Sequence, residues 1–586
     1  MKTGLLNDDY CHRALLLGPS PFLARLSEVG LKQDGSGCLS TALFDQFVAI
    51  DPARNLQELR AYGALPWWTC DDLRVSFWRP VASFTQWVDH RLFPGSLRLM
   101  HVHSILWFAA TVFAVSLLYR RLTDAGWVAG LAALLYLLGD FSYFPTMWLA
   151  NRNVLLSLFF GALALILHDR HRTQGGTFAL VAAPACLLGS LLSAEAGVAT
   201  LAYLFAYEVA LREGRWTGRV LALMPFAVVT IGWRLAYNVL GYGAGGGGFY
   251  FDPVREPLRY TLAVLDRAPF FLGGQWTTVP PDLYSLFSGL SKQVLWGVLL
   301  LVAITIPALM LPLFRANRRA RFWLVGMSLS ALPVCATVPM SRALVFVAVG
   351  AFGLIAEFVG SWQQKARWVP TLGWHRTVMS VLIVTLLVAH LPWAAVRRVT
   401  IAQVTRRLER HVNKTMAISL LWWWRHEDLV LVNAPNPAAF LYDPFRNAYN
   451  GRSLPGGVRV LAPAFGALEV VRTQPHRLVI RAVAGSLLDC PDHGWPHFIS
   501  FYRVLGDVRG SGRPMQVGQR IALPRMTVEV MQVDDRGLPV AAAFDFAVPL
   551  EDSSLQWIYW DWSFRDYAVF PIPGVGQTVT LAGPFP

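Results

Sequence analysis

Charged residues are scarce in this sequence of 586 residues. Only 15% of the residues are Asp, Glu, Lys or Arg, whereas 54% are hydrophobic, and the mean hydropathy is +0.41. Soluble globular chains carry about 25% charged residues. The deficit therefore excludes an ordinary soluble protein and predicts an α-helical polytopic membrane protein.

Cysteines are also few, and runs of basic residues are absent. The six cysteines include no C-x-x-C pair, so the usual spacing of a structural zinc site is missing. Four of them lie outside the apolar spans, which leaves one or two disulfides open: Cys11, Cys38, Cys70 and Cys490. The net charge of +14 is not gathered in Lys/Arg runs with interleaved aromatics. We therefore expect a lipid bilayer, and no nucleic acid, as a partner.

The apolar runs divide the chain into three parts. Residues 1–98 lack a run of about 20 apolar residues and are expected to form an external N-terminal loop region. Residues 99–396 are expected to form a multi-span transmembrane domain. Residues 397–586 contain short alternating runs, which predict an external β-rich domain. Ten candidate spans lie near residues 99–119, 125–140, 153–168, 177–193, 195–211, 218–238, 293–314, 321–338, 343–361 and 376–395.

Basic residues occur in alternate loops between these spans. Such residues stay on the cytoplasmic side of short loops, so the N-terminal and C-terminal parts are predicted to lie outside. The residues concerned are Arg120, Arg121, Arg170, Arg172, Arg212, Arg215, Arg219, Arg315, Arg318, Arg319, Arg321, Lys365, Arg367 and Arg376. An outer N-terminal region needs an exporting segment, so we expect either a first transmembrane helix before Met1 or one span fewer or more than counted.

Two further segments are predicted to lie outside the membrane. Residues 239–291 read as a long external loop that includes GYGAGGGG at 241–248. This stretch contains G-x-G-x-x-G but follows a membrane helix instead of a strand, so a flexible or tight-turning loop is favoured over a dinucleotide site. Residues 404–424 form an amphipathic stretch that ends in Trp422, Trp423 and Trp424, which fit either a membrane interface or a packed core.

The first candidate site is LLNDDYCHRALLLG at residues 5–18. Asp8 and Asp9 are adjacent and are followed by His12 and Arg13, between apolar flanks. Neighbouring carboxylates repel each other and resist desolvation. The cluster therefore indicates acid/base or phosphate chemistry, or a solvated turn.

A second acidic pair lies in PWWTCDDLRVSFWRP at residues 66–80. Asp71 and Asp72 precede an aromatic pair and Arg79. Carboxylates can bind or deprotonate hydroxyls, and arginine binds phosphate with two hydrogen bonds. The stretch fits a sugar or lipid-phosphate site, and it fits an interfacial loop equally well.

Four ionisable residues lie within or beside apolar sequence. Glu195 and Arg234 stand where a charge is costly, which makes them candidate functional residues. Arg152 and Arg342 are isolated cations of predicted outer loops, and each could bind a phosphate. A structural role at a loop apex or a membrane boundary stays open for all four.

Three stretches, in this order, resemble GT-C membrane glycosyltransferases. Residues 77–108 resemble a segment with Tyr/Phe-Arg-Pro, a helical stretch, a lone Asp and a His-containing start of a membrane helix. Residues 131–165 are similar to the following helix pair of O-mannosyltransferase-like relatives, in which W-x-x-x-R separates two half-length spans. Residues 191–205 are similar to their Ser-Lys-Glu stretch, with Ala194 in place of the lysine. The resemblance covers about residues 1–240.

The resemblance implies a function and a set of site residues. In that superfamily an acidic residue or pair follows the first membrane helix, and Asp8 and Asp9 match this position. It implies an inverting transferase of the hexosyltransferase type, with a polyprenyl-phosphate-sugar donor, at the outer face of a bacterial inner membrane. One Asp would be the general base. The residues implied near it are Arg79, Arg152, Glu195 and Arg342.

The sequence leaves open whether the protein uses a metal ion and whether it is an enzyme at all. A divalent cation could bridge Asp8 or Asp9 to phosphate. His101 and His103 form H-x-H without a third ligand at metal spacing, which favours a polar membrane-entry face over zinc. The alternatives to a transferase are a transporter or lipid-binding protein, with Arg234 and Glu195 along a pathway, and an inactive GT-C scaffold. No inverted hydropathy repeat supports the transporter.

Overall fold

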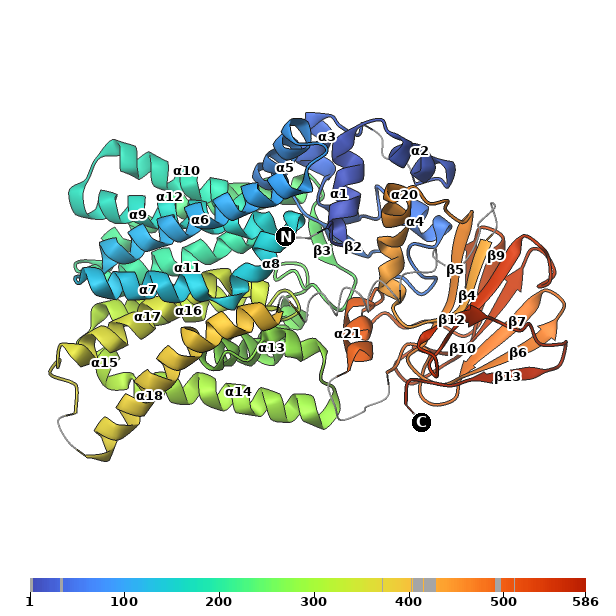
Figure 1. Cartoon of the computed structure of the whole chain (residues 1–586). Coiled ribbons are helices and arrows are strands. Elements are labelled where there is room, and N and C mark those ends of the chain that lie inside the picture. Colours follow the sequence, from blue (N-terminus) through green and yellow to red (C-terminus); the bar gives the residue numbers. More distant parts are fainter. Residues whose placement is uncertain are drawn as a thin grey trace.

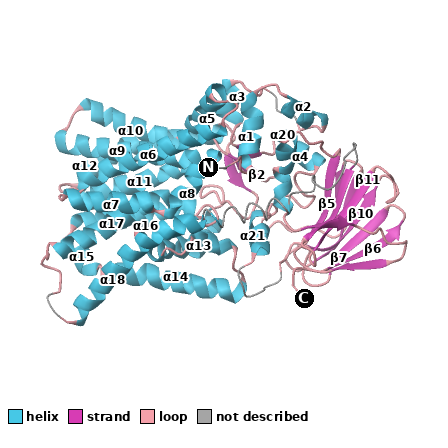
Figure 2. Cartoon of the chain, in the orientation of Figure 1, coloured by secondary structure: helices cyan, strands magenta, loops and turns pink. Residues whose placement is uncertain are grey.

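The computed structural model describes residues 4–31, 35–370, 373–401, 403, 415, 428–490, 497–510 and 512–585. Helices of residues 97–401, here the helical body, occupy one side of the molecule, and β-sheets occupy the other (Figure 1). N-terminal helices lie beside the junction of the two (Figure 2). The predicted order of a helical part followed by a β-rich part is confirmed. The stretch that ends in Trp422, Trp423 and Trp424 lies outside the described residues.

Six helical segments of the described chain are long and apolar enough to cross a membrane. A seventh crossing results if the pair α7 (Gly126–Leu138) and η1–α8 (Asp140–Met147), which is bent by 49°, counts as one span. The six segments are α6 (Leu97–Leu122), η2–α9 (Leu149–Gln174), α12 (Trp216–Val239), α14 (Gly289–Leu309), η6–α17 (Ser341–Gln363) and α18 with the residues after it (Trp374–Ile401).

By length and composition, the structure therefore supports six or seven of the ten spans predicted from the sequence. Three of the expected spans are short helices: α10 (Thr177–Leu191), α11 (Ala199–Ala206), which continues into the π-turn η4 (Tyr207–Leu211), and α16 (Arg318–Val334). The longest of these has 17 residues. At about 1.5 Å per residue it falls short of a hydrocarbon core about 30 Å thick.

Residues 239–291 are not a long loop. They contain α13 (Pro257–Thr277), which packs along α14 and against α16, the helix after the short α15 (Leu311–Ala316). Polar residues lower the mean hydropathy of α13, which is why the sequence did not indicate a helix here. Some of them form hydrogen bonds inside the helical body: Arg267 is 3% exposed and donates to the carbonyl of Cys335 at 3.1 Å. The turn η5 (Pro281–Ser285) then leads into α14.

The N-terminal region, here residues 4–93, consists of short helices and one small sheet. The helices are α1 (Asp8–Leu17), α2 (Pro21–Glu28), α3 (Leu39–Asp45), α4 (Leu56–Tyr62) and α5 (Pro80–Leu92). The antiparallel sheet has the order β1 (Val48–Ile50), β2 (Arg74–Ser76), β3 (Gly243–Gly245). The glycine stretch therefore supplies an edge strand, and at Gly246 an added Cβ would lie 2.7 Å from the Cα of Leu73.

The C-terminal region, here residues 428–585, contains two sheets and two short helices. The antiparallel sheet has the order β13-β6-β7-β10-β9-β8, and the other has the order β12-β11-β4-β5, with β4 parallel to both neighbours. The strands of the first sheet are β6 (Leu468–Gln474), β7 (Arg477–Ala482), β8 (Arg520–Leu523), β9 (Met526–Val533), β10 (Pro539–Phe546) and β13 (Thr578–Leu581). The second has β4 (Asp428–Ala434), β5 (Gly457–Pro463), β11 (Leu555–Asp561) and β12 (Asp566–Val569). The turn η8 (Pro437–Leu441) precedes α20 (Asp443–Tyr449), and α21 (Phe498–Leu505) follows β7.

The N-terminal and C-terminal regions share one hydrophobic core. Trp67 is 2% exposed, packs edge to face on Phe544 at 5.9 Å and donates its indole N–H to the carbonyl of Leu461 at 2.9 Å. The chain therefore closes on itself, and the two regions form one body at one end of the membrane helices.

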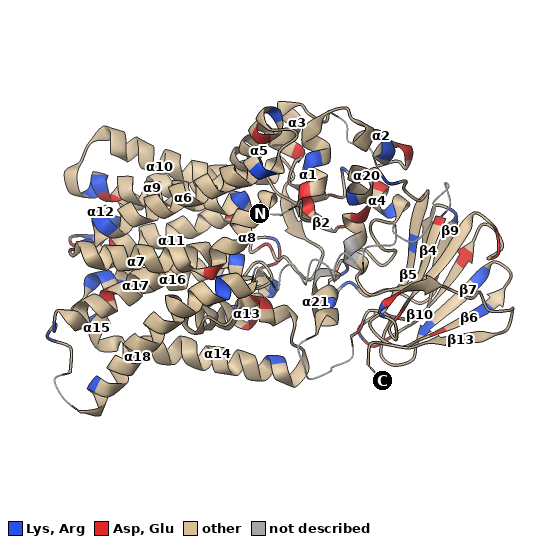
Figure 3. Cartoon of the chain, in the orientation of Figure 1, with Lys and Arg blue, Asp and Glu red and all other residues tan. Residues whose placement is uncertain are grey.

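Basic residues gather at the end of the helical body that is remote from the β-sheets (Figure 3). Several of them are paired there with acids, such as Arg319 with Asp124 and Arg121 with Asp169. The loops that carry the predicted cytoplasmic charges thus share one end, and the side of the bilayer that this end faces stays a prediction.

Candidate functional site

A cavity of about 1300 Å³ lies where the helical body meets the N-terminal and C-terminal regions. Its volume exceeds the range of about 300–1,000 Å³ that is usual for small-ligand pockets, so it has room for more than one small ligand. Aromatic and aliphatic side chains dominate its wall, and acids and arginines are set among them. The wall combines α1, β1, α8, η3, α12, η5, η6, the residues that follow α18 (Trp374–His390), α20 and α21.

The structure separates the two acids of the first candidate site. Asp8 lines the cavity, as does Tyr442 of the C-terminal region. Asp9 is 3% exposed and does not line the cavity, and its oxygens accept the backbone N–H groups of Leu6 at 3.1 Å and Ala150 at 2.8 Å. Adjacent positions of a helix point about 100° apart. Asp8 is therefore the candidate for chemistry, and Asp9 is an anchor.

Burial changes the protonation of two residues of α1. It raises the pKa of Asp9 to about 7, although the hydrogen bonds from Leu6 and Ala150 act in the opposite direction. It lowers the pKa of His12 to about 4, so this imidazole is neutral at pH 7. His12 lines the cavity with its Nδ1 3.3 Å from the amides of Gln46 and Gln86. A neutral ring binds through hydrogen bonds and supplies no positive charge for a phosphate.

Arg79 and Glu195 come together in the cavity wall. Nε and Nη2 of Arg79 both donate to Oε2 of Glu195, at 2.8 and 2.6 Å, and the Tyr237 phenol donates to Oε1 at 3.2 Å. The guanidinium also lies over the rings of Phe77 at 4.3 Å and Phe47 at 5.0 Å. Glu195 neutralises Arg79, so the pair offers hydrogen bonds and a flat aromatic surface instead of a free charge.

Arg342 is the open cation of the cavity wall. It lies over the Trp148 ring at 4.7 Å, and within the described residues no carboxylate forms an ion pair with it. Two other arginines of the wall are paired: Arg234 with Asp252 at 2.7 Å, and Arg397 with Asp140. Arg342 is therefore the group best suited to receive an anion.

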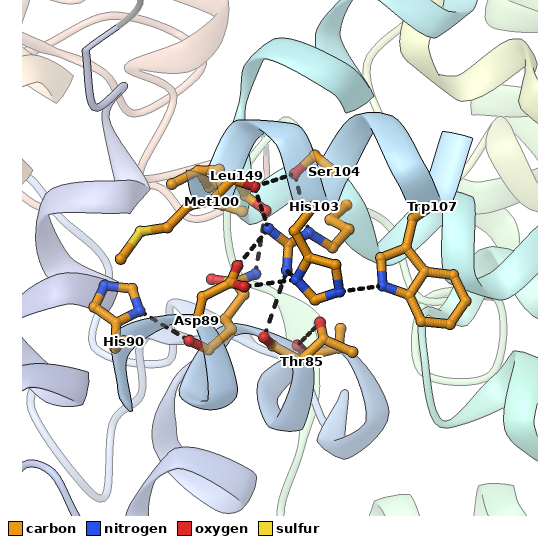
Figure 4. A network of polar contacts seen from close by, with 12 residues as sticks. Thr85, Asp89, His90, Met100, His103, Ser104, Trp107 and Leu149 are labelled. Atoms are coloured by element: carbon orange, nitrogen blue, oxygen red, sulfur yellow. Dashed lines mark hydrogen bonds and ion pairs between the residues drawn. The ribbon is translucent and has the colours of Figure 1, made fainter. Parts of the chain in front are cut away.

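Arg152 does not reach the cavity. It is fully buried, pairs with Asp89 at 2.5 Å and donates to Ser104 and to the Met100 carbonyl, both at 3.0 Å. Figure 4 shows Asp89 between this network and His103. His103 Nδ1 lies 2.6 Å from Asp89, and Trp107 donates to Nε2 at 2.9 Å. The network joins α5, α6 and η2, and the phosphate-binding role predicted for Arg152 does not fit this position.

The second acidic pair also lies away from the cavity. Asp71 is paired with Arg60 at 2.6 Å, and its side chain is 87% exposed. Asp72 accepts from Nε of Arg513 at 2.9 Å, which joins the N-terminal region to the C-terminal region. This arginine holds the pKa of Asp72 below its usual range. The structure gives both acids surface positions in place of a sugar site.

Sequence reasoning missed two residues of the wall, Tyr442 and Trp148. Tyr442 lies in LYDPF between η8 and α20, and only the Asp-Pro after it, which is typical of a helix start, marks the place. Trp148 is the first residue of the W-x-x-x-R pattern. The arginine of that pattern, Arg152, is buried away from the cavity, whereas the tryptophan lines it.

No group of three or more His, Cys, Asp and Glu that could hold a metal ion occurs in the described part of the chain. Asp9, the nearest acid in sequence to Asp8, is held by Ala150. The structure therefore points to no residue set for a divalent cation.

No protein-family model matches the chain, and no curated protein matches it either. Three solved structures are similar to parts of this chain. An Archaeoglobus fulgidus oligosaccharyltransferase tethered with an acceptor peptide is 11% identical, with a TM-score of 0.39 over 79% of this chain and 61% of that chain. The same enzyme in complex with Zn and sulfate is 12% identical, with a TM-score of 0.38 over 79% and 59%. ArnT from Cupriavidus metallidurans, bound to undecaprenyl phosphate, is 14% identical, with a TM-score of 0.30 over 77% and 89%. The chain thus spans about three fifths of the oligosaccharyltransferase.

Proposed function

We propose that the chain is a membrane glycosyltransferase that moves a sugar from a polyprenyl-phosphate donor to an acceptor at the outer face of a bacterial inner membrane. The observation that carries the proposal is one cavity with a carboxylate, Asp8, and an open cation, Arg342, in its wall. The cavity is bounded by the ends of apolar helices, so a lipid chain can lie along the helical body while its phosphate enters the cavity.

In the proposed reaction Arg342 binds the donor phosphate through charge-assisted hydrogen bonds. Asp8 accepts the proton of the acceptor hydroxyl as that oxygen attacks the anomeric carbon. The bond between the anomeric carbon and the phosphate oxygen breaks, and its electron pair leaves with polyprenyl phosphate, whose charge Arg342 stabilises. Attack on the face opposite the phosphate inverts the anomeric configuration.

The Arg79–Glu195 pair supplies the contacts expected for a sugar. Glu195 can accept hydrogen bonds from hydroxyls, and the rings that surround Arg79 can pack against the C–H face of a pyranose. Tyr237 fixes the carboxylate from the other side. We assign the pair to binding and not to acid/base chemistry, because Arg79 and Tyr237 already donate hydrogen bonds to the Glu195 carboxylate.

A lipid-binding or transport protein without chemistry is the second candidate. The bent pair α7 and α8 favours it, because broken helices near a central site are common in transporters. Asp140, at the bend, lines the cavity and is paired with Arg397. This candidate predicts binding of a polyprenyl phosphate without consumption of a sugar-loaded one.

Release of polyprenyl phosphate from labelled polyprenyl-phosphate hexoses, measured in membranes that contain the full chain, tests the proposal. General-base catalysis contributes about 10²–10⁴-fold, so Asp8→Asn should lower kcat at least 100-fold. Arg342→Gln should raise the KM for the donor about 10-fold, whereas Arg520→Gln, whose side chain is 70% exposed on β8, should match wild type. Unchanged turnover in Asp8→Asn would refute the assignment of the base, and donor binding without any turnover would favour the second candidate.

A further inference from the structure

His12 lies one helical turn after Asp8 on α1. Residues four positions apart share one face of a helix, and both of these side chains line the cavity. The imidazole is 6% exposed, so it belongs to the packed wall of the cavity. It is therefore a neighbour of the proposed base on the same face of the helix.

Two glutamines hold one nitrogen of this ring. His12 Nδ1 lies 3.3 Å from Oε1 of Gln86 and 3.3 Å from Nε2 of Gln46. The two amides are fixed in turn, because Gln46 donates to Oε1 of Gln86 at 2.6 Å and Gln86 donates to the Leu149 carbonyl at 3.2 Å. Gln46 and Gln86 are 5% and 2% exposed. This buried network joins α1, α5 and η2, and it orients the imidazole.

The other ring nitrogen, Nε2, forms no hydrogen bond within the described residues, and they do not enclose it. Since His12 lines the cavity, Nε2 is available to a ligand there. In a neutral imidazole this nitrogen is a donor in one tautomer and an acceptor in the other. A hydroxyl group can pair with either form, because it both donates and accepts.

The surroundings of His12 favour a neutral ligand group over a phosphate. The ring is uncharged at pH 7, because burial lowers its pKa to about 4, and the groups at Nδ1 are neutral amides. A phosphate is bound best by charge-assisted hydrogen bonds from a cation, which Arg342 offers elsewhere in the wall. A hydroxyl is thus the group that fits Nε2.

Phe47 connects His12 with the Arg79–Glu195 pair. The His12 ring packs edge to face on the Phe47 ring at 4.7 Å, and the Arg79 guanidinium lies over the same ring at 5.0 Å. All four side chains line the cavity. A pyranose that packs against the aromatic surface around Arg79 therefore lies next to His12.

We propose that His12 is a specificity-determining residue that binds one hydroxyl of the transferred sugar through Nε2, in a subsite that Gln46 and Gln86 orient. The inference rests on the proposed function and adds a substrate class, a neutral sugar with a free hydroxyl at the position that faces His12. A site built to bind a hydroxyl disfavours the analogue that lacks it, because the polar group of the site is then left without a partner.

Monodeoxy donors test the inference. Membranes that contain the full chain are first assayed with labelled polyprenyl-phosphate glucose, mannose and galactose, and the best donor is then compared with analogues that each lack one hydroxyl. The loss of one hydrogen bond corresponds to about a tenfold change. For wild type, kcat/KM should therefore fall about 10-fold for the analogue that lacks the hydroxyl facing His12.

His12→Phe keeps a ring against Phe47 and removes both nitrogens. This variant should use that one analogue and the parent donor equally well, while its discrimination against the other analogues stays as in wild type. Gln46→Leu should weaken the discrimination at the same hydroxyl, since it removes one of the amides that orient the ring.

His90→Phe is the matched control. His90 is 7% exposed, and its Nδ1 lies 2.8 Å from the backbone carbonyl of Gln86, but it does not line the cavity. Its replacement should leave the discrimination among donors unchanged, whatever its effect on the unfolding midpoint.

Three results would overturn the inference. They are equal use of all analogues by wild type, unchanged discrimination in His12→Phe, and an equal loss of kcat/KM for every donor in that variant, which is the pattern of a structural residue. Failure of the proposed function looks different: Asp8→Asn then keeps full activity, or wild type turns over no donor, and the inference falls with it.

Discussion

The Asp9 carboxylate accepts a hydrogen bond of 2.8 Å from the backbone N–H of Ala150. Ala150 lies in η2, and two residues later Arg152 is locked onto Asp89 of α5. The start of α1 is therefore held by the helical body, and it carries Asp8 to the cavity. Asp9 thus fixes the turn of α1 that places Asp8 in the cavity wall, which gives the two adjacent carboxylates different surroundings.

Asp9→Asn should remove a pH dependence of stability. The pKa of Asp9 is raised to about 7 in the folded protein, against an ordinary value of 3.8. The folded state therefore holds a proton that the unfolded state has lost between about pH 4 and 7, so stability falls as pH rises through this window and levels off above it. At about 1.4 kcal/mol per pKa unit the fall is roughly 4 kcal/mol. Thermal midpoints in detergent at pH 4.5, 6 and 8 measure it.

The comparison with wild type decides the result. The Asn side chain cannot ionise. The thermal midpoint of Asp9→Asn, relative to that of wild type, should therefore increase as the pH rises. Parallel curves for the two proteins would contradict the assigned burial of the carboxylate. The variant should keep most of its transfer activity, in contrast to Asp8→Asn.

Removal of one member of the Arg152–Asp89 pair should destabilise the protein. Arg152 is fully buried and the Asp89 side chain is 2% exposed, so Asp89→Leu leaves a buried guanidinium without its carboxylate, and Arg152→Met leaves a buried carboxylate with its contact to His103 but without its guanidinium. Such a loss costs about 3–5 kcal/mol. We expect Arg152→Met and Asp89→Leu to lower the unfolding midpoint strongly, and the double variant Arg152→Met/Asp89→Leu to cost less than the sum of these two single changes.

The same variants distinguish a structural role from phosphate binding. If Arg152 bound the donor phosphate, Arg152→Met would raise the donor KM at unchanged stability. The exposed Arg520→Met serves as the control for loss of a positive charge, since its side chain is 70% exposed.

The sequence predicts the helical body and its β-rich partner well, because long apolar runs and alternating runs leave strong signals. It fails where polar residues are satisfied internally, as for Arg267 of α13, whose partner is the Cys335 carbonyl. It also cannot show which of Asp8 and Asp9 faces the cavity. That depends on the hydrogen bond between Asp9 and the backbone N–H of Ala150, a residue far away in the sequence. Tyr442 carries no periodic signal, because its place in the cavity wall depends on the packing of α20 against α1 and α2 at the other end of the chain.

Asp71→Ala and Asp72→Ala should leave transfer unchanged. Both acids lie outside the cavity wall, with side chains 87% and 62% exposed. Exposed ion pairs contribute about 0–1 kcal/mol, so the free energy of unfolding should change by no more than that. Initial rates of donor turnover and unfolding midpoints, measured beside Asp8→Asn, test this prediction. A loss of turnover comparable to that of Asp8→Asn would restore the second acidic pair as a site.

Gly248→Ala should weaken the junction between the glycine stretch and the C-terminal region. The N–H of Gly248 donates to the Asp507 carbonyl at 2.9 Å, and an added Cβ would lie 1.8 Å from Oδ2 and 2.6 Å from Cγ of the same residue. Movement of the carboxyl tip alone cannot relieve both contacts, because Asp507 Oδ1 also accepts the Gly510 N–H at 2.8 Å.

Gly245→Ala is the matched control, since its added Cβ would lie 3.7 Å from its nearest neighbour, an ordinary contact. Overpacking costs about 1–3 kcal/mol, so Gly248→Ala should unfold at a lower midpoint and be cleaved sooner by limited proteolysis than Gly245→Ala. Because α20 and α21 of the same C-terminal region line the cavity, a loosened junction should also lower turnover in Gly248→Ala. Equal midpoints and equal turnover in the two variants would show that the junction does not support the site.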